Sequence, residues 1–197
     1  HIPIQGLGWQ VLTSTFGPDG RLFFTLWKPR GNRSQLWALQ GKKETTGMVE
    51  VKALLAKGVS SYRVDQLLSF LDHADRRIRL ESQFELANRK ETKSLRAKAI
   101  DSKSALLPRL HALWGLGQLK ASDRDLLKLI CQDKDAEMRA QAARWAGDLG
   151  FDPDNLVPDL LRDPSPRVRL MAGIACGKLM SKDALEPLSN LIVGAGN

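Results

Sequence analysis

The sequence is poor in the residues that most often carry chemistry. Only two cysteines and three histidines occur in 197 residues. Cys-x-x-Cys-His, Gly-x-Ser-x-Gly and Gly-rich phosphate-loop motifs are missing, as is any His/Cys/Asp cluster at metal-ligand spacing. The sequence therefore nominates no catalytic, cofactor-binding or metal-binding residue. We expect His73 and His111 to be surface or packing histidines, and Cys131 and Cys176, which fall in helical apolar patterns, to be buried thiols.

Long apolar runs are also missing. No stretch of 18 apolar residues exists that could span a bilayer. The first residues, His1-Ile2-Pro3, include neither an initiator Met nor a charged and then apolar signal segment. We expect no membrane span in this segment and a chain that begins inside a longer protein, whose compartment stays open.

Acidic residues are scarce in the first part of the chain. The net charge is +8, with 20 Lys/Arg against 10 Asp/Glu in residues 1–121 and 10 against 12 in residues 122–197. A basic segment can attract nucleic acid, anionic lipid or an acidic protein. Here the basic residues are interspersed with Glu81, Glu85 and Glu91. This mixture favours a solvated helix face and argues against a nucleic-acid site.

What the sequence does contain is an internal repeat. Four arginines, which we call the marker arginines, stand 30 residues apart at Arg79, Arg109, Arg139 and Arg169. Eight residues after each marker comes a small residue: Ala87, Gly117, Gly147 and Gly177. A period of this length indicates stacked supersecondary units. We expect the small residues to let neighbouring helices pack closely.

Each repeat is predicted to be two helices with a short turn just before the marker arginine. The apolar stripes of the first helices are Leu67/Leu68/Phe70/Leu71, Leu126/Leu127/Leu129/Ile130 and Leu156/Val157/Leu160/Leu161. In the second repeat this helix is diluted by polar residues. Pro164 and Pro166 are expected to end one helix and begin the next. Residues 184–193 fit only the first helix of a truncated fifth repeat, which would leave Leu188, Leu191 and Ile192 poorly covered.

The repeats resemble short HEAT-like repeats. The resemblance covers residues 61–183 and rests on Asp133…Met138-Arg139…Ala146-Gly147 and on Asp163-Pro164…Val168-Arg169…Cys176-Gly177. It implies a ladder of ion pairs between adjacent repeats, made by Arg79, Arg109, Arg139 and Arg169 with Asp133 and Asp163. The positions equivalent to these aspartates hold His73 and Lys103 in the first two repeats. The implied fold is an α-solenoid over residues 61–197.

The sequence ahead of the repeats has a different character. Three apolar segments, 9–13, 22–27 and 35–39, read as antiparallel strands, with a turn at Gly17-Pro18-Asp19-Gly20. The chain is therefore predicted to be mainly α, with a β segment at 1–41 and a linker at 42–60.

Part of this β segment resembles the closing blade of a quinoprotein propeller of the glucose/sorbosone dehydrogenase type. The residues concerned are Phe16-Gly17-Pro18-Asp19-Gly20-Arg21-Leu22-Phe23-Phe24, Trp27 and Leu36-Trp37-Ala38-Leu39. In similar bacterial proteins the propeller leads into HEAT-like repeats and often on to a cytochrome c domain. The resemblance implies a periplasmic or cell-envelope parent in which other domains carry PQQ and haem c, while this segment carries no cofactor.

Three functions remain open from the sequence. The favoured one is a non-catalytic HEAT-like scaffold of a larger quinoprotein dehydrogenase-like protein, with other domains of the parent or a separate protein as its partner. The alternatives are a nucleic-acid-binding HEAT-like solenoid and a HEAT-like module of the bilin-lyase kind.

Overall fold

The structure is a computed structural model that describes residues 10–17, 21–28, 33–41, 46–121 and 123–194, without the side chains of 191–194. The chain divides into two compact units, with the boundary between Val59 and Ser60.

The N-terminal unit contains an antiparallel sheet in the order β1-β2-β3, as the sequence predicted. Its strands are β1 (Gln10–Phe16), β2 (Leu22–Lys28) and β3 (Arg33–Leu39). Phe24 of β2 lies between Ser14 and Trp37 in the register, and is 5% exposed. Residues 18–20 of the expected turn lie outside the described residues, and the Gly17 N–H donates to the Arg21 carbonyl at 2.8 Å. The segment expected to be a linker contains helix α1 (Thr46–Lys57).

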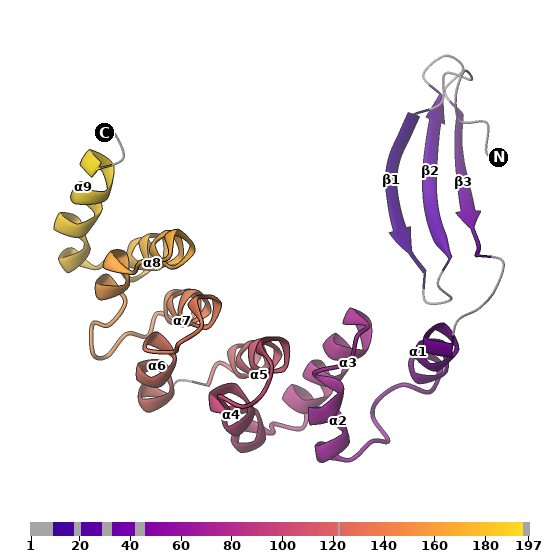
Figure 1. The fold of residues 1–197 in the computed structure, drawn as a ribbon, viewed down its shortest axis with the longest axis horizontal. Helices are drawn as coiled ribbons and strands as arrows, with labels where there is room; N and C mark the ends of the chain where they lie inside the picture. Colours follow the sequence, from indigo (N-terminus) through magenta and orange to yellow (C-terminus); the bar gives the residue numbers. More distant parts are fainter. Residues whose placement is uncertain (1–9, 18–20, 29–32, 42–45, 122, 195–197) are drawn as a thin grey trace. The chain divides into compact units, whose positions relative to one another are not determined.

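The second unit is a stack of helix pairs, which establishes the predicted mainly α, solenoid-like fold (Figure 1). In that figure the second helices of the pairs form one row, on the concave side of the stack, and the first helices form another. The first helices are α2 (Val64–Phe70), α4 (Thr92–Ile100) and α6 (Arg124–Cys131); the second are α3 (Arg76–Asn88), α5 (Leu106–Gln118), α7 (Ala136–Leu149) and α8 (Pro166–Leu179); α9 (Leu185–Gly194) follows.

Local sequence signals explain where these helices begin. The carboxylates of Asp75, Asp123 and Asp135 accept hydrogen bonds from backbone N–H groups in the first turns of α3, α6 and α7. Pro166 is the first residue of α8, as predicted, since its missing N–H would have no intrahelical partner there.

The ends of the second helices follow the same period. A left-handed residue follows each helix, at Lys90, Lys120, Gly150 and Met180, with φ between 50° and 62°. In each case the next N–H donates back to a carbonyl five residues earlier, as from Glu91 to Leu86. This is the Schellman arrangement, which satisfies carbonyls at a helix end. The sequence did not reveal it, because three of the four positions lack the usual glycine.

The core lies between the two rows of helices. Its largest fully buried side chains come from both rows: Leu67, Leu71, Ile78, Leu86, Leu95, Leu113, Leu116, Leu126, Leu127, Ile130, Met138 and Leu161. Burying one such side chain contributes about 1.5–3 kcal/mol. Because this core is shared between adjacent pairs, neighbouring repeats stabilise one another.

Two expectations about the helices were wrong. The first helix of the fourth repeat is replaced by a short 3-10 helix, η1 (Pro158–Arg162). The Asp152 carboxylate accepts from the N–H groups of Leu156 and Val157, and Asn155 has φ 53°, so the chain turns where an α-helix was expected to begin.

The second concerns Gly177, which was expected to be a close-packing position. An added Cβ at Gly147 would lie 2.9 Å from the Cα of Ala175, whereas one at Gly177 would meet no atom of the described residues within 4 Å. The packing partner of Gly147 is Ala175 of α8, 28 residues further along the chain.

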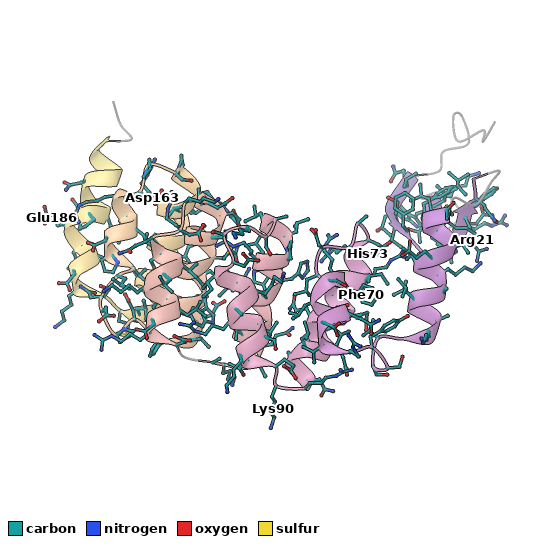
Figure 2. The ribbon with its side chains drawn as sticks, turned by 60° about the horizontal axis from the view of Figure 1, so that its bottom comes forward. Arg21, Phe70, His73, Lys90, Asp163 and Glu186 are labelled. Atoms are coloured by element: carbon teal, nitrogen blue, oxygen red, sulfur yellow. The ribbon has the colours of Figure 1, made fainter. Side chains whose placement is uncertain are left out.

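The turns of the stack lie at two opposite edges. In Figure 2, His73 and Asp163, from the turns inside the first and fourth repeats, lie along one edge. Lys90, from a turn between repeats, lies at the other. In the described residues, no helix has the length and apolar character needed to cross a membrane. The side chains of Leu191 and Ile192 lie outside the described residues, whereas Leu188 is half-buried.

Candidate functional site

Two of the marker arginines form ion pairs between adjacent repeats. Arg139 binds both carboxylate oxygens of Asp163, with Nε–Oδ2 at 2.7 Å and Nη2–Oδ1 at 2.9 Å. Arg109 likewise donates through Nη1 and Nη2 to the carboxylate of Asp133. The Arg139 guanidinium holds the pKa of Asp163 below its usual value, although partial burial opposes the shift. Paired in this way, the aspartates connect the second repeat to the third and the third to the fourth.

The marker arginines also hold the turns of their own repeats. Nη1 of Arg79, Arg139 and Arg169 donates to the carbonyls of His73, Asp133 and Asp163, at 2.6–2.8 Å. Arg109 differs, because its Nε donates instead to the carbonyl of Ala99 at 3.0 Å. Arg109 is only 2% exposed.

His73 takes over one task of an aspartate. The Asp133 and Asp163 carboxylates accept from the N–H groups of Asp135 and Ser165, two residues further on. His73 Nδ1 accepts in the same way from the Asp75 N–H at 2.9 Å. Sequence reasoning missed this role, although the position of His73 six residues before Arg79 was the available signal.

The junction between the first and second repeats is built differently. The position equivalent to Asp133 and Asp163 is Lys103, and Arg79 Nε instead donates to His111 Nε2 at 3.2 Å. Because Nε2 accepts, the proton lies on Nδ1, which is 2.7 Å from Gln83 Oε1. Burial, followed by the charges of Arg79 and Arg76, lowers the pKa of His111 to about 4. His111 is therefore a neutral packing residue whose ring lies edge-on to Trp114.

The second helices of three successive repeats enclose an open groove of about 470 Å³. Apolar, amide and charged side chains line it. From α3 these are Arg76, Leu80 and Gln83; from α5 Leu113, Trp114, Gly117 and Gln118; and from α7 Gln141, Arg144, Trp145, Asp148 and Leu149. A concave, largely apolar surface with a few polar groups is the form expected of a binding site. The sequence offered no direct signal for it, since its residues come from three repeats.

A chain of hydrogen bonds fixes one wall of the groove. Trp114 Nε1 donates to Gln141 Oε1 at 2.9 Å, and Gln141 Nε2 donates to Glu137 Oε1 at 2.8 Å. Glu137 also pairs with Arg167 of α8, at 3.2 Å. The chain joins α5 to α7 and α8, so the orientation of the Trp114 indole is set by side chains of the two repeats that follow its own.

The charges of the groove differ between its two ends. At the α7 end, Asp148 lies 3.4 Å from Arg144 Nε and 2.5 Å from Lys178 Nζ. At the α3 end, Arg76 is exposed and has no hydrogen-bond or ion-pair partner among the described residues. Arg76 is therefore a lining cation without a carboxylate partner among the described residues, whereas Arg144 shares one.

The reactive side chains lie elsewhere. Cys131 and Cys176 are buried free thiols, as predicted, and burial raises the pKa of Cys131 to about 12. In the part of the chain that the structure describes, His, Cys, Asp and Glu side chains form no group that could hold a metal ion.

Comparison with known protein families identifies the repeat type in the C-terminal part of the helical stack. No match was found among curated protein sequences. Residues 124–194 match the sequence profile of the HEAT repeat family. The helix pairs from Val64 onward follow the same 30-residue register as the matched residues.

Proposed function

We propose that the helical unit is a non-catalytic scaffold that binds a protein partner in the groove between α3, α5 and α7. The observation that carries the proposal is the groove itself, which three successive repeats build and which Trp114 and Trp145 line. HEAT repeats commonly mediate protein interactions. Tryptophan is also among the residues that contribute most to protein-binding energy.

Further apolar side chains on the second helices support a protein partner. Phe84 and Ile174, each five residues after a marker arginine as Trp114 is, are 47% and 48% exposed. Leu170 of α8 is 56% exposed. These side chains extend the apolar surface beyond the groove, and exposed apolar patches of this kind are typical of interaction sites.

We further propose that this scaffold belongs to a larger quinoprotein dehydrogenase-like protein, whose partner is another of its own domains or a separate protein. Two features support this: the resemblance of residues 16–39 to a closing propeller blade, and the β1-β2-β3 meander, because propeller blades are small antiparallel sheets. Phe16 and Leu36, on the two outer strands, are 69% and 70% exposed, as expected of side chains that further strands would cover. PQQ and haem c would then be bound by other domains of a periplasmic or cell-envelope protein.

Site-specific photocrosslinking in the natural full-length protein tests the scaffold. A crosslinking amino acid at Gln118 in the groove is expected to capture a protein segment, from the same chain or another. The same amino acid at Leu129, 51% exposed on α6, serves as the matched control. Capture from Leu129 but not from Gln118 would contradict the proposal. The wider assignment is tested by the flanking gene sequence, which should encode propeller blades upstream and Cys-x-x-Cys-His downstream.

A further inference from the structure

The junction between the first two repeats lacks the carboxylate found at the following junctions. Asp133 and Asp163 neutralise Arg109 and Arg139, whereas Lys103 occupies the equivalent position opposite Arg79. The groups to which Arg79 donates hydrogen bonds are neutral: the carbonyls of His73 and Ala74 and the ring of His111. Among the described residues, Arg79 therefore forms no ion pair with an acidic side chain.

A second uncompensated arginine lies on the same side of the groove. Arg76 lines the groove together with Leu80, Gln83 and Trp114, and forms no ion pair with the described residues. Both Arg76 and Arg79 lie close enough to His111 to act on its charge. Two neighbouring guanidinium groups without a carboxylate create a local positive potential that an anionic group would neutralise.

The composition of the groove favours a peptide over a nucleic acid as the source of that anion. The exposed Gln118 can hydrogen-bond to a peptide backbone, and the partly exposed Leu80 and Trp114 can cover an apolar side chain. Nucleic-acid binding depends on many phosphate contacts, and Arg76 is the one lining cation without a described ion-pair partner.

We propose that the groove binds an acidic segment of its protein partner, with a carboxylate of that segment paired to Arg76 and an apolar side chain beside it packed on Leu80 and Trp114. The positive charge of Arg79, which donates a hydrogen bond to His111, adds to this attraction. This inference rests on the proposed scaffold function, and it names the chemistry of the segment that the scaffold recognises.

Fluorescence anisotropy with labelled peptides tests the proposal on the full chain. The acidic probe alternates Glu with Leu and Phe, and the neutral probe has Gln in place of each Glu. The acidic probe is expected to bind at least about tenfold more tightly, since one lost charge pair is worth about that factor. Arg76→Glu should remove this preference. Lys93→Glu, the same charge change at an exposed site on α4, should leave it intact.

Four results would overturn the proposal. Equal binding of the two probes, unaffected by Arg76→Glu, would mean a groove that selects apolar side chains only. Equal weakening by Arg76→Glu and Lys93→Glu would mean attraction by net charge alone. Tighter binding of a single-stranded oligothymidylate, lost in Arg76→Glu, would assign the arginines to nucleic acid. Failure of both probes, with crosslinks from Gln118 retained, would refute the acidic segment and leave the scaffold standing.

Discussion

Gly147 and Gly177 occupy the same register position, and alanine is expected to have opposite effects at the two. At Gly147, a Cβ would lie 2.9 Å from both Cα and Cβ of Ala175. The Cα cannot move aside unless α8 moves, so overpacking should cost about 1–3 kcal/mol. Alanine recovers about 1 kcal/mol of helix propensity. Gly147→Ala should therefore lower the free energy of unfolding by up to about 2 kcal/mol.

At Gly177 only the favourable contribution of helix propensity remains, because an added Cβ meets no atom of the described residues within 4 Å. Gly177→Ala should raise the free energy of unfolding by up to about 1 kcal/mol. Urea unfolding followed by far-ultraviolet circular dichroism measures both changes, with an unchanged urea dependence confirming that the same transition is compared. If Gly147→Ala stabilised the protein as much as Gly177→Ala, the close approach of α7 and α8 would be refuted.

Three further predictions concern the ion pair, the buried histidine and the helix ends. Arg109→Met should lower the free energy of unfolding by roughly 3 kcal/mol, since it leaves Asp133 partly buried without its cation; a loss below about 1 kcal/mol in urea unfolding would contradict this. His111 has a folded pKa of about 4 against 6.5 for the free side chain, so the unfolded chain binds the proton first. Stability should be fully present above pH 6.5 and fall by about 1–3 kcal/mol as the pH drops to 4. His111→Gln should flatten that part of the stability profile, and an unchanged slope would refute the assignment. Met180→Gly should raise the thermal midpoint, because the left-handed conformation of Met180 costs about 1–2 kcal/mol that glycine avoids. A lowered midpoint would contradict this.

The repeat architecture could be predicted because its signals recur every 30 residues. The marker arginines and the apolar stripes located the helix pairs, and Pro166 located the beginning of α8. The expected strands also formed, because their Thr, Phe and Trp residues favour extended backbone. In these cases the secondary structure that the local sequence favours is also the one that packs in the folded chain.

In other places, single side chains have roles that their residue types do not predict. Asp152 turned the chain ahead of η1, and His73 served as a hydrogen-bond acceptor in place of an aspartate. Lys90 ends α3 in a conformation that usually calls for glycine. The groove escaped prediction for a different reason: Leu80, Trp114 and Arg144 meet only after three repeats have stacked.

Hydrogen exchange with and without the acidic probe peptide tests the central claim, that the second helices form the binding surface. Bound peptide should slow exchange in α3, α5 and α7, which line the groove, and leave α2, α4 and α6 unchanged. Slowed exchange confined to α2, α4 and α6 would place the binding surface on the first helices and contradict the account.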